Sequence, residues 1–270
     1  KNLVWFHFIN GDMEKAKYFF DSVKTRTEKD FNVTIYYNFA RVLEAENAEE
    51  SKSVYDQIIS KHPGYLSARM RRLFFRVIEN DNSNLKEDMD RLLSNNASDL
   101  EVRSFYSWFL KNNHTDPKKS DNLETAHNKE TLVKYNSHDF YALTSLANLY
   151  LMIGREAKRG HSPKDQDNSK QSFLKAVQLF QKVLQLDPFS IFAAQGIAIV
   201  FAESKRFGPA LEILRKARDS LDNEDVHVNM AHCLLEMHEY AKAIELYEFS
   251  LKKFGNEENR PKLLNLLGRA

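Results

Sequence analysis

Cysteine, glycine and proline are scarce in this sequence of 270 residues. There is one cysteine, Cys233, so no internal disulfide can form and a thiolate-rich metal site is excluded. So little cysteine is typical of a reducing compartment, the nucleus or the cytosol. Eight glycines and six prolines fall far below the average usage of roughly 12%. Because sheet proteins need many turns of these residues, the shortage favours helices joined by short loops.

A strong charge of one sign and a long apolar run are also missing. The 39 basic and 38 acidic side chains give a net charge of +1, whereas a protein that binds nucleic acid through a basic surface should be clearly positive. The longest apolar stretch, 191–202, is shorter than the ~20 residues that span a bilayer. Disorder is excluded by a hydrophobic content of 42%. Residue 1 is Lys rather than Met, so we expect a fragment of a longer chain.

Motifs that carry chemistry are absent as well. The sequence contains no phosphate-binding G-x-x-x-x-G-K or G-x-G-x-x-G, no G-x-S-x-G and no H-E-x-x-H. His227, His232 and Cys233 share one predicted helix, but spacings of five and one do not give the i, i+4 pair that a metal site needs, which favours structural packing. We therefore predict no catalytic residue, no metal and no cofactor.

A repeat is the main positive signal. Ala198 and Ala231 are 33 residues apart, and so are Ala210 and Ala243, each within a helical pattern of apolar residues. Two antiparallel helices approach closely only where small residues lie at their crossing, and larger side chains fill the space beside it. Pro188 then ends one unit and begins the next. The pattern predicts stacked helix pairs.

Two parts of the chain depart from this regularity. The unit that ends at Pro188 is about 17 residues too long, and the polar excess between Gly154 and Ser172 predicts a loop or a helix extension. The stretch from Leu66 to Tyr135 has the length of two units, but it fits the pattern loosely.

The repeated residues resemble the tetratricopeptide (TPR) repeat, strongly in 31–64 and 138–256 and weakly in 65–135. A HEAT or armadillo array is the alternative, but its repeat of roughly 40–47 residues fits the spacing less well. The resemblance implies an all-α fold: an α-α superhelix, the right-handed TPR solenoid, with about five repeats and partial repeats at both ends. We expect one array over 1–270 with these parts: a partial repeat at 1–30, a repeat at 31–64, two degenerate repeats at 65–135, a repeat at 138–189 with its insertion near 154–172, repeats at 190–222 and 223–256, and the start of another at 257–270.

Whole segments carry a closer resemblance. They are 37–45, 55–65, 192–197, and 227–232 together with 247–254. Together they are similar to the large TPR scaffold subunits of the RNA polymerase II-associated factor (PAF) elongation complex, and the loops rich in Asn, Lys and Asp resemble fungal members.

The resemblance implies a non-catalytic nuclear scaffold that assembles the PAF complex on RNA polymerase II and supports transcription elongation and co-transcriptional histone modification. The implied partners are peptide or helical segments of other PAF subunits, and RNA polymerase II indirectly, with no direct sequence-specific nucleic acid and no membrane. Two alternatives stay open: a TPR arm of another multisubunit assembly or enzyme, and a co-chaperone-type peptide-binding TPR module.

The concave face, lined by the first helix of each repeat, is the expected binding surface. The TPR register places ten candidate partner-binding residues there: Tyr37, Arg41, Tyr141, Thr144, Asn148, Phe192, Gln195, Ile199, Val228 and His232. Their aromatic, aliphatic and amide groups suit an extended or helical partner segment better than a carboxylate clamp. Alternatively, some of these side chains pack within the superhelix and bind nothing.

Two further features are weighed in the same way. Arg69, Arg71, Arg72 and Arg76 form a basic run that suits an acidic partner or nucleic acid, although nearby acidic residues could pair with it and cancel its field. Ser162-Pro163, within the insertion, matches a proline-directed phosphorylation site, a dipeptide that is also common by chance.

Overall fold

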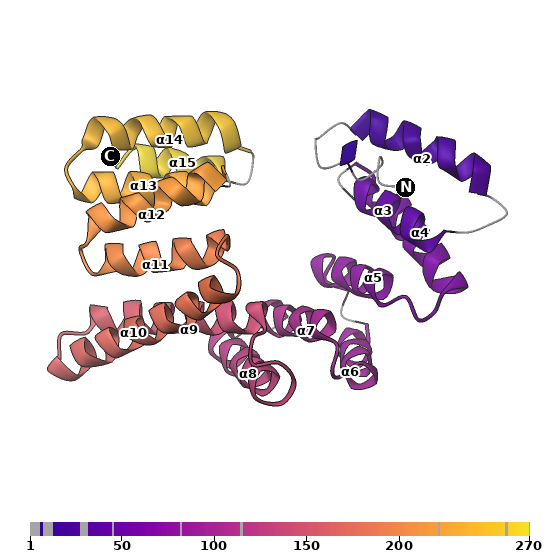
Figure 1. The fold of residues 1–270 in the computed structure, drawn as a ribbon, viewed down its shortest axis with the longest axis horizontal. Coiled ribbons are helices and arrows are strands. Elements are labelled where there is room, and N and C mark those ends of the chain that lie inside the picture. Colours follow the sequence, from indigo (N-terminus) through magenta and orange to yellow (C-terminus); the bar gives the residue numbers. More distant parts are fainter. Residues whose placement is uncertain are drawn as a thin grey trace. The chain divides into compact units, whose positions relative to one another are not determined.

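A computed structural model of the chain describes residues 6–7, 13–27, 32–44, 46–81, 83–113, 116–220, 222–256 and 259–269. Every regular element in these ranges is a helix (Figure 1). The helices gather into two units, Lys1–Asn113 and His114–Ala270, and each is described by itself. The predicted all-α class is confirmed. The predicted terminal parts 1–30 and 257–270 lie partly outside the described residues.

The first unit contains six of the labelled helices: α2 (Met13–Thr27), α3 (Val33–Leu43), α4 (Ala48–Lys61), α5 (Leu66–Ile78), α6 (Leu85–Asn95) and α7 (Leu100–Asn112). Helix α3 packs on α2 and α4 around a core in which Phe20, Phe39 and Tyr55 are almost fully buried. Where α3 and α4 meet, Ala40 and Ser51 have no exposed surface, and the Ser51 hydroxyl donates to the Ala40 carbonyl at 2.9 Å. Small side chains thus allow the close approach that the repeat pattern requires.

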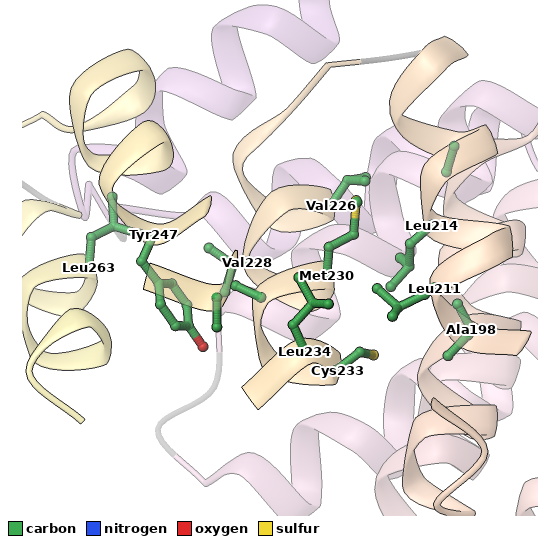
Figure 2. Packing of buried hydrophobic residues seen from close by; sticks show 14 residues of the cluster. Ala198, Leu211, Leu214, Val226, Val228, Met230, Cys233, Leu234, Tyr247 and Leu263 are labelled. Carbon is green, nitrogen blue, oxygen red and sulfur yellow. The ribbon is translucent and has the colours of Figure 1, made fainter. Parts of the chain in front are cut away.

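The second unit begins with α8 (Pro117–Glu130) and the short π-helix η1 (Thr131–Tyr135). The helices after η1 are α9 (Phe140–Arg159), α10 (Pro163–Leu186), α11 (Ile191–Glu203), α12 (Phe207–Ser220), α13 (Glu224–Glu236), α14 (Tyr240–Phe254) and α15 (Arg260–Leu267). Neighbouring helices pack in pairs along the chain. Figure 2 shows the core of α11 to α15, where Leu211, Leu214 and Met230 fill the space beside the small Ala198.

Asparagine and aspartate side chains begin many of these helices. Each accepts a hydrogen bond from a backbone N–H three residues later, at 2.8–3.3 Å, and the residues are Asn32, Asn47, Asp99, Asp139 and Asn223. Such caps satisfy one of the free N–H groups of the first turn. The Asn and Asp residues at the ends of the loops therefore also fix where the next helices begin.

The polar insertion extends two helices rather than forming a loop. Helices α9 and α10 run on through it and pack against each other along their length. Near the base of the extension Ser169 donates to the Gly154 carbonyl at 2.8 Å, and at the tip Ser162 caps α10. Of the two expected outcomes, the helix extension is confirmed. It brings the basic end of α9 toward α11, where Arg155 and Lys158 meet Glu203.

Candidate functional site

The two candidate residues of the first unit, Tyr37 and Arg41, lie on α3 beside a carboxylate that is already satisfied. Glu44 accepts from Arg41 at 2.6 Å, from the Tyr55 hydroxyl at 2.5 Å and from Arg71 at 2.5 and 2.9 Å. Burial raises the pKa of Tyr37, while the charges of Arg41 and Arg71 oppose the rise. Arg41 is thus engaged within the unit, and half-buried Tyr37 packs beside Tyr55 and Tyr65 at ring distances of 5.8 and 5.5 Å.

The second unit contains a cavity of about 320 Å³ between α9, α11, α12 and α13. Its floor is apolar and includes the small side chains Ala198 and Ala202, next to Ile199 and Phe207. Because the alanine side chains of α11 are small, they leave this space unfilled. The volume suits one or two side chains of a partner segment rather than a large cofactor.

Charged groups from two helices form one rim of the cavity. Glu203 accepts from Arg155 at 2.7 Å and from Lys158 at 3.0 Å, and Lys158 also donates to the Glu203 backbone carbonyl. Burial alone would raise the pKa of Glu203, but the bonds from Lys158 and Arg155 lower it overall, so the carboxylate stays ionised. The extended α9 is thereby tied to the end of α11. The ammonium group of Lys205, which also lines the cavity, forms no hydrogen bond or ion pair with any described residue.

Residues of α13 form the opposite wall of the cavity, and two of them have shifted pKa values. Burial and the charge of Lys262 lower the pKa of His232, whose Nδ1 lies 2.7 Å from the Tyr247 hydroxyl. Burial, with a smaller effect of Glu236, raises the pKa of the Cys233 thiol to about 11. The Cys233 thiol is protonated at neutral pH and is therefore a poor nucleophile and a poor metal ligand, and the Nδ1 of the His232 imidazole lies within hydrogen-bond distance of the Tyr247 hydroxyl. In the described ranges no group of three His, Cys, Asp or Glu side chains could hold a metal ion.

The predicted residues of this unit divide into three groups. Ile199 and His232 line the cavity. Four others lie on α9 and α11 outside it, mostly exposed: Tyr141, Thr144, Asn148 and Phe192, of which Phe192 is 67% exposed.

Gln195 and Val228 are buried, with 9% and 5% exposure, as in the alternative that some of these side chains pack within the superhelix. Figure 2 shows Val228 among the core side chains. The physical reason is that neighbours cover several sides of each helix: α11 contacts α9, α10, α12 and α13, while α13 contacts α11, α12 and α14.

Several cavity residues escaped the sequence reasoning. On α13 the lining residues are Asn229, His232, Cys233 and Glu236, at i, i+3, i+4 and i+7, whereas the TPR register placed Val228 and His232 there. The helical spacing alone could have indicated this face, since it contains the polar residues of α13. No local signal places Arg155 and Lys158 at the rim, because they reach it only through the extension of α9.

Comparisons with known proteins confirm the sequence resemblance. No family model matches the chain. Over 274 residues and its whole length, the chain is 58% identical to the RNA polymerase-associated protein CTR9 of Saccharomyces cerevisiae. Over 96% of its length it is 30% identical to tetratricopeptide repeat protein 1 of Schizosaccharomyces pombe. The chain spans about a quarter of the length of these relatives, 25% and 24%. Both are fungal, as expected.

A solved structure supports the fold. A tetratricopeptide repeat protein from Parabacteroides merdae superposes with a TM-score of 0.63 at 13% identity, covering 98% of this chain and 96% of that one. At this identity the likeness concerns the fold alone, and it confirms the TPR class.

Proposed function

We propose that this chain, which is similar over its whole length to a quarter of CTR9, is the TPR-array part of a non-catalytic scaffold of the PAF complex. In this proposal it works in the nucleus, assembles other subunits on RNA polymerase II and supports transcription elongation and co-transcriptional histone modification. The observation that carries the proposal is the 58% identity to a protein named as RNA polymerase-associated. Contact with the polymerase is indirect, through those subunits.

Binding in this proposal uses the cavity of the second unit. A partner segment inserts an apolar side chain between Ile199 and Ala202, and displacing water from this floor supplies the free energy. Phe192 on α11 and Tyr141 on α9 are exposed and lie outside this cavity. The charges of Lys205 and Glu236 at the cavity edge set the orientation of the segment more than its affinity.

The chemistry of the cavity supports a binding role. Its histidine and its cysteine both have pKa values that keep them uncharged near neutral pH, and Glu203 is held by two cations. A cysteine that acts as a nucleophile would instead need a lowered pKa. We therefore propose no catalysis and no cofactor. No helix in the described ranges has the length and apolar character that a bilayer crossing needs. The proposed partners are proteins, without a membrane and without direct sequence-specific nucleic acid.

The experiment is affinity purification of the tagged chain from fungal nuclear extract, followed by mass spectrometry. Phe192→Asp combined with Ile199→Asp places charges on the exposed aromatic and on the cavity floor, so we expect the PAF subunits to be lost. Leu174→Asp is the control, because Leu174 is 59% exposed on α10 and does not line the cavity of about 320 Å³.

Circular dichroism establishes that each variant keeps its helices. The proposal fails if folded Phe192→Asp/Ile199→Asp recovers every subunit as well as Leu174→Asp does. Recovery of chaperones instead of transcription proteins by the unmodified chain would favour the co-chaperone alternative.

A further inference from the structure

The basic run of the first unit separates into arginines that are paired and one that is not. Arg71 binds Glu44, Arg72 binds Asp56 at 2.7 Å, and Arg76 binds Asp81 and Asp88 at 3.0 and 2.7 Å. The guanidinium group of Arg69 forms no hydrogen bond or ion pair with any residue that the structure describes. The four arginines therefore do not form a uniform basic face, because only the charge of Arg69 has no acidic partner.

Arg69 opens into a cavity of about 270 Å³ between α4, α5 and α6. Arg91 on α6 lines the same cavity, is exposed, and also lacks an ionic or hydrogen-bonding partner among the described residues. A third guanidinium, that of Arg72, completes the rim. The sole carboxylate in the lining, Asp88, is already held by Arg76 at 2.7 Å. Two unpaired guanidinium groups, and a third that is bound by Asp56, thus line a space whose one acid is bound by Arg76.

The rest of the lining decides which anion fits. Ile59, Leu73 and Leu92 form an apolar floor, and no aromatic side chain contributes to the lining. Bases of single-stranded nucleic acid bind chiefly by stacking on aromatic rings, which this cavity does not offer. An arginine fork instead pairs with carboxylates through two parallel N–H···O bonds, and a floor of this size takes one leucine-sized side chain.

We propose that this cavity, formed by Arg69, Arg72 and Arg91 over Ile59, Leu73 and Leu92, docks an acidic segment of a protein partner. Glutamate or aspartate carboxylates of the segment pair with the guanidinium groups, and an aliphatic side chain between them enters the apolar floor. The site lies in the first unit and shares no residue with the cavity of the second, so it does not depend on the proposed function.

A neighbouring surface shows why free charge matters. A larger cavity of about 650 Å³ lies on the same unit and is lined by Lys52, Arg72, Arg76 and several carboxylates. There Lys52 binds Glu79 at 2.6 Å, and the two arginines have the partners named above. An acidic segment would have to displace these carboxylates, whereas Arg69 and Arg91 are available without such a cost.

The test measures fluorescence anisotropy of the labelled peptide Asp-Glu-Leu-Glu-Asp with the full chain. We expect saturable binding that weakens as salt is added, since the rim is exposed to solvent. Replacing the acidic residues by Asn and Gln should abolish it, and replacing the leucine by serine should weaken it. Arg69→Glu combined with Arg91→Glu should weaken binding by at least about tenfold, because two attractive forks become repulsive.

The matched control is Arg215→Glu combined with Lys216→Glu on exposed positions of α12, which changes the net charge by the same amount. Its affinity should stay within about twofold of the unmodified chain, because neither residue lines the cavity or can form a fork with the peptide there. Circular dichroism and thermal unfolding verify that both variants fold. The proposal is overturned if the peptide does not bind, if the two variants weaken binding equally, or if a single-stranded RNA of equal charge binds more tightly than the peptide.

Discussion

Two glycines of the second unit, Gly154 on α9 and Gly196 on α11, each face an aromatic ring of α10. A Cβ atom at Gly196 would be 2.3 Å from the Phe180 ring, and one at Gly154 would be 2.6 Å from the Phe173 ring. Both rings are buried, Phe180 completely. The absence of a side chain at these positions is what lets α10 pack flat against α9 and α11.

Gly196→Ala should therefore destabilise the chain even though alanine favours a helix. The helix gains about 1 kcal/mol from the exchange, whereas forcing an extra carbon into a filled core typically costs about 1–3 kcal/mol. We expect a net loss of up to about 2 kcal/mol in urea unfolding. Gly208→Ala is the control, because nothing lies within 4 Å of a Cβ there, and it should not destabilise.

A double variant separates the ring contact from other causes. In the background of Phe180→Leu the same Gly196→Ala exchange should cost less, since the ring no longer occupies the space. Equal costs in both backgrounds would show that the clash with Phe180 is not the reason.

At the same scale, the repeat register assigns Ile199, His232, Gln195 and Val228 to one face, whereas in the structure the first two line the cavity and the last two are buried. Each helix has several neighbours, and each neighbour covers a different face. The repeat register shows which positions correspond between repeats, but it does not show how much of each face a neighbouring helix covers. Cavity residues such as Lys158 depend on a contact 45 residues away along the chain, which no local pattern encodes.

Among the elements, the turn between α11 and α12 and the turn between α13 and α14 share one geometry. Lys205 and His238, 33 residues apart, both have a positive φ, 59° and 62°. In each turn the following residue donates its N–H back to the helix, Arg206 to Phe201 and Glu239 to Leu234, both at 2.9 Å. This is a Schellman ending in which glycine usually occupies the left-handed position. The scarcity of glycine thus leaves backbone strain in the turns.

Lys205→Gly should relieve this strain. A residue other than glycine in the left-handed region costs about 1–2 kcal/mol, and Lys205→Gly removes this cost. Glycine also has more conformational freedom in the unfolded chain, which offsets part of the gain, so we expect the free energy of unfolding to rise by up to about 1 kcal/mol. Chemical denaturation measures it. Lys205→Ala removes the same side chain but keeps the strain, and it should not stabilise. A glycine variant no more stable than the alanine variant would contradict the argument.

The elements also show how far the repeat pattern extends. The apolar periodicity and the 33-residue spacing predict the helices of 191–254 because each turn repeats the last. The insertion was ambiguous, since a polar stretch rich in Lys, Asp and Gln suits a loop and an exposed helix equally. The contact of Phe173 with Gly154 and the bond from Ser169 to its carbonyl select the helix, and both depend on packing rather than on propensity.

For the whole molecule, a net charge near zero does not prevent the stability from depending on pH, because individual groups have shifted pKa values. Among the described residues three carboxylates have a lowered pKa in the folded state: Asp81 in the first unit, and Glu203 and Asp222 in the second. Hydrogen bonds to Asp81 come first from Ser83 and then from Arg76, and those to Asp222 come first from Lys253 and then from His227. The pKa of His232 is lowered too, through burial first.

All four groups favour the folded chain at neutral pH and act in the same direction on acidification. An imidazole whose folded pKa lies below its ordinary value of 6.5 is protonated more readily in the unfolded chain, so stability begins to fall below about pH 6.5. The carboxylates, with ordinary values of 4.5 for Glu and 3.8 for Asp, add a second and steeper loss below about pH 4.5. Thermal unfolding should therefore show a Tm that declines in two stages.

His232→Gln tests the assignment of the first stage. Glutamine can still hydrogen-bond the Tyr247 hydroxyl but does not titrate, so the Tm of this variant should be nearly constant between about pH 7.5 and pH 5. Its second stage should stay, because Glu203, Asp222 and Asp81 are unchanged. Glu203→Gln should do the opposite, keeping the first decline and softening the second. If His232→Gln loses stability between about pH 7.5 and pH 5 as fast as the unmodified chain, burial of this imidazole is not what makes the fold sensitive to mild acid.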